Sequence, residues 1–260
     1  MSETSLIFEK SGQIAKIIFN RPKDYNVFNK DMAERLEEAI ADLEGSKEIR
    51  AVILTGAGNK AFISGTDIKE LQKRTVLDNV DIVSYRQNIF RRIENLGIPT
   101  IAAINGYAFG GGCEISMTCT FRFAAQEAKL GQLEINLGLM PGGGGTQRLA
   151  RLVGKSVAAE LLLTGKTISA DEALNIGLVN KIFPEKDLMR ESEKFACLIA
   201  EKSPVAVRMI LMALNKGIEV DTDTGLFIEM LSCSVCLSSE DFREGVNAFL
   251  EKRKPAFKGR

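Results

Sequence analysis

The sequence of 260 residues contains no histidine. This absence excludes Ser–His–Asp and Cys–His catalytic groups, and it excludes metal sites built on histidine ligands. Any acid–base chemistry would therefore depend on Asp, Glu, Lys, Tyr or Cys side chains.

An excess of charge is also missing, because 34 basic and 34 acidic side chains cancel. The composition thus gives no attraction toward nucleic acid or a membrane surface. No apolar run approaches the ~18–20 residues that cross a bilayer. The N-terminal MSETSLIFEK lacks a basic region followed by an apolar core, so no secretory signal is predicted. We predict a cytoplasmic protein without a nucleic-acid or membrane partner.

Paired cysteine motifs are scarce. The five cysteines stand at positions 113, 119, 197, 233 and 236, and only Cys233 and Cys236 form a CxxC. A zinc or redox site would need a second pair or a strand–turn context. We interpret these two as small residues one turn apart on a helix, and we predict no metal.

Nucleotide-binding motifs are missing as well. A P-loop needs a glycine five residues before GK[ST]. The two GK[ST] triplets, at 154–156 and 165–167, have Leu149 and Glu160 at that position. The glycine runs at 110–112 and 142–145 lack the spacing of a dinucleotide fingerprint. ATP and NAD are poorly supported, and no cofactor is expected.

Strands and helices are predicted to alternate in the first half of the chain. Short apolar segments predict strands at 5–10, 14–19, 50–55, 100–104 and 121–125. Apolar residues at helical spacing predict helices that begin after Asn29 and within 81–97. A late strand is expected at 178–183, and helices from Ser203-Pro204 to about residue 252. The pattern is typical of an α/β core with a C-terminal helical extension.

The stretch AINGYAFGGGCEISM (103–117) places three glycines before a single acid, Glu114, in an apolar segment. A lone buried carboxylate is costly, which suggests a use for it. Backbone N–H groups of glycine can approach a developing oxyanion without a side chain intervening. A helix that starts near Gly111 would add the favourable potential of its N-terminus. The alternative is a glycine-rich turn needed for close packing.

Two further segments carry similar features. Glu134 lies among apolar residues in KLGQLEINLGLMPGGGG, and it could form a carboxylate pair with Glu114. Burial and mutual repulsion in such a pair would raise at least one pKa. In AFISGTDIKE, Thr66 or Asp67 would cap a short helix and offer a second N–H beside Lys69. Taken singly, the glutamates could be surface groups and the third segment a simple capped helix.

Taken together and in this order, the three segments resemble the crotonase (enoyl-CoA hydratase/isomerase) superfamily, and the hydratases most closely. The similarity also covers NRPKDYNVFN (20–29), LTGKTISADEALNIGLVNKI (163–182) and the ending REGVNAFLEKRKPAFKGR. The resemblance implies a spiral of ββα turns in residues 1–195. A C-terminal helical region, residues 196–260, would drive assembly into homotrimers, which commonly pair into hexamers.

The resemblance also implies a lyase reaction, the addition of water to an enoyl-CoA thioester. The thioester oxygen would lie between the N–H groups of Thr66 and Gly111. Glu114 would help activate the water that adds at C3, and Glu134 would supply the proton to C2. Coenzyme A would be part of the substrate, so the reaction would need no separate cofactor.

Further residues that match the family pattern predict how the substrate is held. The predicted CoA contacts are Lys23, Asp24, Val27, Ser64, Asp67, Ile68, Lys69, Lys254 and Lys258. The last two could equally be a solvated charged end. The residues expected to line the acyl pocket are Tyr85, Phe90, Leu139, Met140 and Phe257.

The chain departs from the family pattern at two places. Thr66 stands where alanine is usual, so a hydroxyl borders the thioester site. Thr120 stands where an aspartate usually follows Cys119, which puts the local support near Arg122 in doubt.

Alternative functions remain within and outside this family. The chain could act on a specialised acyl-CoA, of carnitine type or with a cyclic enoyl group. Isomerases usually keep one acid of the pair, so the presence of both glutamates disfavours isomerisation. An RNA-binding or scaffolding role has little support from the zero net charge and the few aromatic residues. The acyl group itself is left open by the sequence.

Overall fold

The N-terminal part of the chain forms the two predicted strands and the predicted helix in a computed structural model, which describes residues 4–260. Strands β1 (Leu6–Ser11) and β2 (Ile14–Phe19) pair antiparallel. After a 3-10 turn, η1 (Pro22–Asp24), helix α1 (Lys30–Gly45) begins at Asn29, whose side chain accepts the Met32 N–H. The apolar stripe of α1 is buried, as its spacing predicted.

Three successive pairs of strands then build a spiral. The pairs are β3 (Ala51–Gly56) with β4 (Ala61–Ile63), β5 (Thr100–Ile104) with β6 (Tyr107–Phe109), and β7 (Phe121–Ala125) with β8 (Lys129–Gly131). The first strand of each pair joins a six-stranded sheet of order β1-β2-β3-β5-β7-β10, and the second joins a four-stranded sheet of order β4-β6-β8-β9. Each turn of chain thus adds one strand to both sheets, which confirms the expected spiral.

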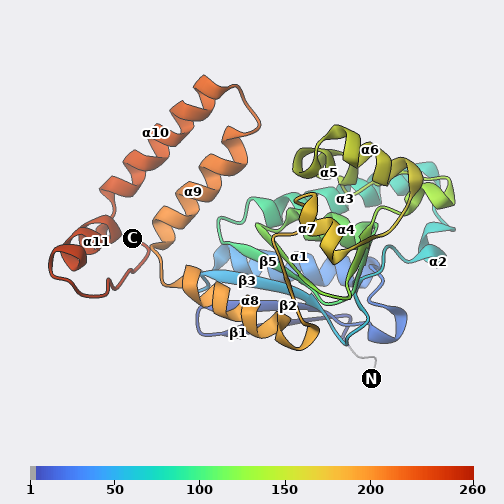
Figure 1. The fold of residues 1–260 in the computed structure, drawn as a ribbon, viewed down its shortest axis with the longest axis horizontal. Coiled ribbons are helices and arrows are strands. Elements are labelled where there is room, and N and C mark those ends of the chain that lie inside the picture. Colours follow the sequence, from blue (N-terminus) through green and yellow to red (C-terminus); the bar gives the residue numbers. More distant parts are fainter. Residues whose placement is uncertain (1–3) are drawn as a thin grey trace.

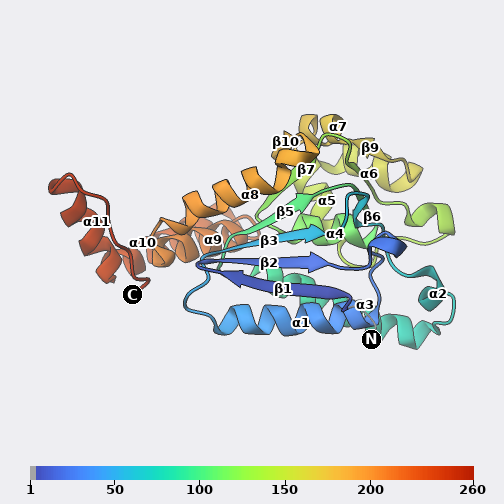
Figure 2. The same ribbon diagram turned by 90° about the horizontal axis from the view of Figure 1, so that it is seen from below.

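Helices connect these strand pairs and cover the sheets (Figures 1 and 2). They are α2 (Ile68–Leu71), α3 (Val76–Glu94), α4 (Gly111–Thr118), η2 (Glu134–Leu137), α5 (Gly145–Val153), α6 (Lys155–Thr164) and α7 (Ala170–Asn175). Helix α1 packs against β1 and β2, whereas α8 (Glu185–Ala200) packs across β2, β3, β5 and β7. All residues of β3 and β5 are buried, so the centre of the core lies at these strands.

The late strand is shorter than predicted. Strand β9 (Ile168–Ser169) precedes α7, and β10 comprises only Lys181–Phe183, although the prediction began at residue 178. The N–H groups of Leu178 and Val179 both donate to the Ala173 carbonyl, so these residues close α7. Apolar character alone cannot distinguish such a helix end from a strand.

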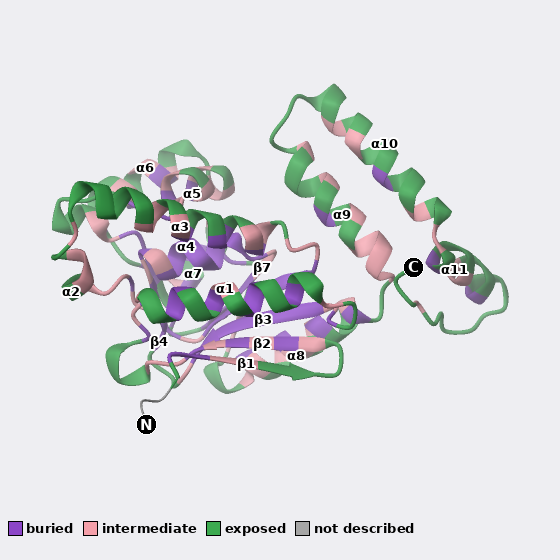
Figure 3. Ribbon diagram, turned by 180° about the vertical axis from the view of Figure 1, so that it is seen from behind, coloured by how far each residue is buried: buried purple, intermediate pink, exposed green. Residues whose placement is uncertain are grey.

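The C-terminal helices form an arm that leaves the core (Figures 1 and 3). This arm consists of α9 (Pro204–Gly217), α10 (Thr222–Ser238) and α11 (Glu240–Leu250). The expected division at residues 195 and 196 falls inside α8, where Ala196 and Ala200 are buried. The chain leaves the sheet after Ala200, and the Arg50 guanidinium fixes this point by donating to the carbonyl oxygens of Ala200 and Phe257.

Helix α10 carries the CxxC residues one turn apart, Cys233 exposed and Cys236 half-buried, as interpreted from the sequence. Across residues 4–260, no helix has both the length and the apolar character to cross a membrane.

Candidate active site

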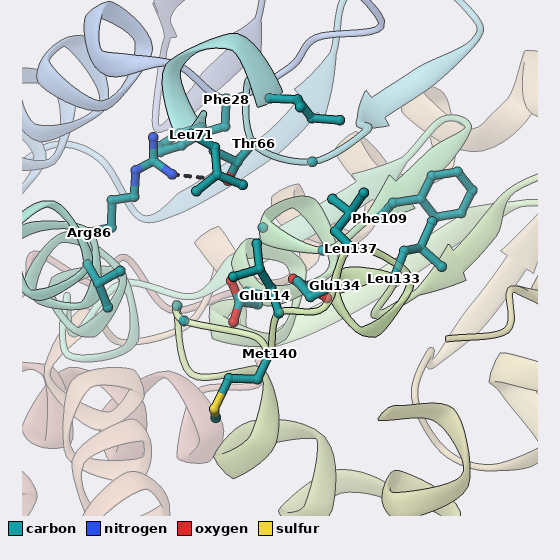
Figure 4. A pocket seen from close by; sticks show the side chains of 18 of the residues that line it. Phe28, Thr66, Leu71, Arg86, Phe109, Glu114, Leu133, Glu134, Leu137 and Met140 are labelled. Carbon is teal, nitrogen blue, oxygen red and sulfur yellow. Dashed lines mark hydrogen bonds between the residues drawn. The ribbon is translucent and has the colours of Figure 1, made fainter. Parts of the chain in front are cut away.

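A cavity of about 420 Å³ lies where the two spiral turns after β4 and β6 meet α3 and the segment after η2 (Figure 4). Its size and mixed lining are typical of small-molecule sites. The apolar part of the wall includes Phe28, Leu71, Val83, Phe90, Phe109, Leu133, Leu137, Leu139 and Met140. The polar part includes Ser64, Thr66, Arg74, Asn79, Arg86, Glu114, Glu134 and Asn136.

The turn between β6 and α4 has a backbone that requires glycine. Gly110 has φ 49° and ψ −118°, a conformation that side chains strongly disfavour. A Cβ atom at Gly112 would lie 2.1 Å from the Ile63 carbonyl oxygen, so this helix packs directly on β4. Gly111 is the first residue of α4, and its N–H therefore belongs to the unsatisfied donors of a helix N-terminus.

The turn after β4 presents a second N–H. Phe28 forms an isolated parallel bridge with Thr66, in which the Phe28 N–H donates to Gly65 O and the Asp67 N–H donates to Phe28 O. The two turns face each other, because a Cβ at Gly111 would lie 3.6 Å from Thr66 Oγ1. Within residues 4–260, the N–H groups of Thr66 and Gly111 donate to no protein acceptor. Two such donors in a cavity wall can stabilise an oxyanion.

Glu114 lies one turn into α4 and is 4% exposed. One carboxylate oxygen accepts the Gly145 N–H, at 2.8 Å, from the N-terminus of α5. The other lies beside Gly143, where a Cβ would come within 2.4 Å of it. Burial raises the pKa of Glu114 to about 7, and the Gly145 N–H partly opposes this rise. The carboxyl is therefore held rigidly and can exchange a proton near neutral pH.

Glu134 is the first residue of η2 and is less buried than Glu114. Its Oε1 would lie 2.9 Å from a Cβ at Gly110, so it contacts the turn that presents the Gly111 N–H. With its amide nitrogen turned toward Glu134, Gln132 donates to both carboxylate oxygens, at 3.1 and 3.2 Å. Burial raises the pKa of Glu134 too. Figure 4 shows both glutamates directed into the cavity.

An arginine outside the cavity holds the loop that contacts Glu114. Arg148 donates two hydrogen bonds to Glu94, at 2.6 and 2.9 Å, and a third to the Gly143 carbonyl oxygen at 2.7 Å. Bidentate pairs of this kind fix geometry as well as charge. The Glu114 carboxylate is consequently positioned from both sides, by α4 and by the 143–145 segment.

The predicted CoA contacts divide into two groups. Ser64 and Ile68 line the cavity, and the loop of Lys23, Asp24 and Val27 lies next to them. Hydrogen bonds join the two segments, since the Ser64 N–H donates to Tyr25 O and the Phe28 N–H to Gly65 O. Asp67 and Lys69 belong to the same turn, and the Asp67 side chain caps α2.

Lys254 and Lys258 lie far from this cavity in the same chain. Both are exposed beside the arm, and the Lys258 N–H donates to Asp241 at the start of α11. Their predicted contact with CoA phosphates would require a second subunit.

The predicted acyl wall is only partly assembled. Phe90, Leu139 and Met140 line the cavity, whereas Tyr85 and Phe257 do not. The Tyr85 hydroxyl donates to Glu37 on α1, at 2.7 Å, which turns this side chain away. Phe257 packs beside Gly245 at the arm.

Val83, Arg86 and Arg74 also line the cavity, and none of the three was named as a site residue from the sequence. The first two could have been found from periodicity. Val83 and Arg86 precede the buried Phe90 by seven and four residues on α3, so they share its helix face.

Thr120, which stands where the family usually has an aspartate, forms hydrogen bonds of its own. The Thr120 N–H donates to Thr100 Oγ1 at 2.9 Å, and the Thr100 N–H donates to Thr120 Oγ1 at 3.2 Å. Arg122 is buried and donates to the carbonyl oxygens of Leu178 and Cys119. Both polar groups thus have partners, and the segment is supported without the usual aspartate.

Comparisons with known proteins show the family of this chain. A family model described as enoyl-CoA hydratase/isomerase matches residues 9–260. The chain is 44% identical to a short-chain-enoyl-CoA hydratase of Clostridium acetobutylicum, covering 100% of both chains. It is 42% identical to a crotonyl-CoA hydratase of Syntrophomonas wolfei, covering 99% of both.

Solved structures give the same result. The crystal structure of an enoyl-CoA hydratase from Bacillus anthracis matches 98% of this chain and 100% of its own, with a TM-score of 0.96 and 40% identity. An enoyl-CoA hydratase structure from Mycobacterium smegmatis matches with a TM-score of 0.94 at 31% identity, covering 98% of this chain and 99% of its own.

Proposed function

The chain belongs to the enoyl-CoA hydratase/isomerase family and is an enoyl-CoA hydratase, a hydro-lyase, and from this premise we propose how its residues add water to the substrate. The acyl-CoA thioester enters the cavity with its carbonyl oxygen between the N–H groups of Thr66 and Gly111. The observation that carries this proposal is the pair of unsatisfied N–H groups facing each other beside the buried Glu114 and the half-buried Glu134.

The oxyanion donors address the charge that develops during the reaction. Addition of water at C3 of a conjugated thioester moves electron density onto the carbonyl oxygen. Fixed N–H groups stabilise that charge without reorganisation, and loss of one such donor typically lowers the rate ~10²–10³-fold. The N-terminus of α4 adds a favourable potential to the Gly111 donor.

The two glutamates supply the proton transfers. Glu114 accepts a proton from the attacking water, which its pKa of about 7 permits because the carboxyl is partly ionised at neutral pH. Glu134, whose pKa burial raises, delivers a proton to C2. The Gly145 N–H and the Gln132 amide hold the two carboxylates in separate orientations, so each can keep one role.

Hydration of crotonyl-CoA in the presence of EDTA tests this proposal. The purified chain should remove the absorbance of the conjugated thioester at a rate proportional to enzyme concentration. No hydration across a panel of short, long and cyclic enoyl-CoA substrates would contradict it. Migration of the double bond in a 3-enoyl-CoA, without hydration, would instead favour an isomerase.

We also propose that the arm drives self-association as a homotrimer, with a pair of trimers as the alternative. The arm exposes many large apolar side chains, and an unpartnered apolar surface of this size indicates a contact. The exposed apolar side chains of the arm include Ile210, Met212, Leu214, Leu226, Phe227, Met230, Leu231, Val235, Phe249 and Leu250. On this proposal, the division of the chain into core and assembly region lies at the end of α8.

Sedimentation of the wild-type chain and of Phe227→Asp tests the assembly. The wild type should sediment as a trimer or hexamer, and the added charge should shift it toward monomer. Glu229→Gln, at another exposed position of α10, should not shift it. A wild-type monomer at micromolar concentration would contradict the proposal. The cytoplasmic location and the independence from a cofactor stay predictions.

A further inference from the structure

Two buried arginines line the same end of the cavity. Arg86 is 8% exposed and lies on α3, and Arg74 lies just before that helix with its side chain 8% exposed. In Figure 4 Arg86 lies on one side of the two glutamates, and Phe109 and Leu133 lie on the other. The cavity therefore has a cationic end and an apolar end, with the proposed reacting centre between them.

The protein does not balance these two charges. Among residues 4–260, a single carboxylate, Glu70, comes within ion-pair distance of them, at 4.0 Å from each guanidinium. Glu70 is itself half-exposed and also accepts the Lys30 N–H at 3.4 Å. Glu114 acts on Arg86 only as a more distant charge. Two buried cations thus share one half-exposed anion at the limit of ion-pair distance, an arrangement that is costly unless another anion joins it.

Unused hydrogen-bond donors accompany the unbalanced charge. The Nε of Arg74 is buried and has no partner among residues 4–260. Arg86 donates one hydrogen bond, to Thr66 Oγ1 at 3.0 Å, and its guanidinium otherwise lies over the Phe28 ring at 5.2 Å from the centroid. A guanidinium carries five N–H donors in a fixed fork that matches a carboxylate. Burial, together with repulsion from Arg74, lowers the pKa of Arg86 to about 10, so it is still a cation at neutral pH.

The position of Arg86 limits which part of the substrate could be the anion. It is one hydrogen bond from Thr66, whose N–H binds the thioester oxygen in the proposed function. The whole pantetheine arm separates that oxygen from the phosphates of CoA, so the phosphates cannot lie here at the same time. An anion at this end must belong to the acyl group, and it must lie within a few bonds of the thioester.

We propose that the acyl group this enzyme takes is a short 2-enoyl chain ending in a carboxylate, bound by Arg86 and Arg74. This inference rests on the proposed function and adds the substrate class to it. Arg86 and Arg74 are then specificity-determining residues, and the Thr66 hydroxyl orients the Arg86 guanidinium. The reaction at C2 and C3 is unchanged, since the carboxylate takes no part in it.

The wild-type enzyme gives the first test. Its kcat/KM is measured for 4-carboxybut-2-enoyl-CoA, for the matching 4-carbamoyl compound, which is neutral and of the same shape, and for crotonyl-CoA. The kcat/KM for the acid should exceed that for the amide at least ~10-fold, because charge-assisted hydrogen bonds are stronger than neutral ones. An amide used as well as the acid would overturn the inference.

Variants then separate recognition of the acyl group from support of the Thr66 turn. Arg86→Gln and Arg74→Gln should each lower kcat/KM for the acid ~10²-fold, the loss typical when one partner of a buried charge pair is removed. The loss in kcat/KM for crotonyl-CoA should be at least ~10-fold smaller than the loss for the acid, because crotonyl-CoA has no carboxylate for the arginines to bind. Arg91→Gln, at an exposed position on α3, is the matched control and should change kcat/KM for neither substrate.

Thr66→Val distinguishes binding of the acyl carboxylate by Arg86 from a role in which Arg86 only supports the Thr66 turn. This change removes the hydroxyl that accepts from Arg86 but leaves the guanidinium in place. If Arg86 only supported the turn, Thr66→Val and Arg86→Gln would each lower kcat/KM for the acid and kcat/KM for crotonyl-CoA by equal factors. That result would overturn the inference. If Arg86→Gln does not fold, the wild-type comparison and Arg74→Gln decide. Equal hydration of all three substrates would refute the acyl assignment and leave the hydratase function standing, whereas no hydration of any would refute both.

Discussion

Two turns of the spiral each present one proposed oxyanion N–H donor, but the helices that follow them differ in length and in burial. The turn after β6 begins α4, whose residues from Gly112 to Thr118 are all buried. The turn after β4 begins α2, which has four residues, none of them buried. A helix held by the core can fix a carboxylate to within a fraction of an ångström, whereas a short exposed helix can change its side chains without disturbing the core.

The charges near the two turns follow the same division. Glu114 and Glu134 lie beside the α4 turn, and Arg74 and Arg86 lie beside the α2 turn. Chemistry common to all enoyl-CoA substrates requires the first group. Choice among acyl groups requires the second. We therefore expect substitutions at the α4 turn to lower the rate for every substrate, and substitutions at the α2 turn to redistribute rates among substrates.

The largest expected effect is the loss of either glutamate. Glu114→Gln and Glu134→Gln keep shape and much of the hydrogen bonding but cannot exchange protons. Each should lower kcat at least ~10²–10⁴-fold with a smaller change in KM, because the CoA contacts lie elsewhere. Steady-state hydration beside thermal unfolding measures this. A folded variant with near-normal kcat would remove that glutamate from the mechanism.

Gly143→Ala should displace Glu114 without removing it. The added Cβ would meet the Glu114 carboxylate at 2.4 Å and the Phe90 ring at 2.7 Å, so one of them must move. A displacement of about 1 Å can cost ~10²-fold in rate, and we expect a loss of that order in kcat. Gly45→Ala, where a Cβ meets nothing within 4 Å, is the control. Equal activity of both variants would show that the carboxylate position is not critical.

Glu114 should also make stability depend on pH. Its folded pKa of about 7 exceeds the ordinary value of 4.5, so the folded state binds this proton more tightly than the unfolded state. The contribution to stability is fully present below pH 4.5 and is lost as pH rises through 7, by up to roughly 3 kcal/mol. Relative to Glu114→Gln, the wild type should lose free energy of unfolding between pH 4.5 and pH 8.

Urea unfolding at several pH values measures that difference. Glu38→Gln, an exposed position on α1, should show no comparable change. A wild-type and Glu114→Gln pair whose difference is independent of pH would mean that the Glu114 carboxyl is not desolvated in the folded protein.

The smallest expected effect is that of Thr66→Ala on crotonyl-CoA. The backbone N–H survives the change, and only the hydroxyl and its hydrogen bond from Arg86 are lost. Hydration of crotonyl-CoA should stay within ~10-fold of wild type. A loss beyond ~10³-fold, more than one oxyanion donor is worth, would give the hydroxyl itself a role in the chemistry.

Local sequence signals predicted much of the fold. The apolar stripe of α1, its Asn29 cap and the strand at 100–104 were all read directly from spacing and propensity, and the structure confirms them. The late strand was predicted too long because Leu178 and Val179 close α7 through the Ala173 carbonyl. A hydrogen bond to a residue five or six positions earlier leaves no mark in an apolar run.

The candidate site was predicted in part for a similar reason. Glycines beside an acid mark the α4 turn because both residue types are unusual in an apolar segment. Tyr85 was expected in the pocket, but one residue along a helix is a rotation of about 100°, and Arg86 faces the cavity instead. Arg74 gave no signal, because its burial depends on how α2 and α3 pack.

The double variant Glu114→Gln/Glu134→Gln tests the central claim most directly. If the two glutamates act as one acid–base unit, the kcat of the double variant in crotonyl-CoA hydration should be close to that of the worse single variant, since groups that serve one step are not additive. Thermal unfolding must show all four proteins folded at the assay temperature. A double variant whose loss equals the product of the two single losses would contradict the account, because the glutamates would then act independently.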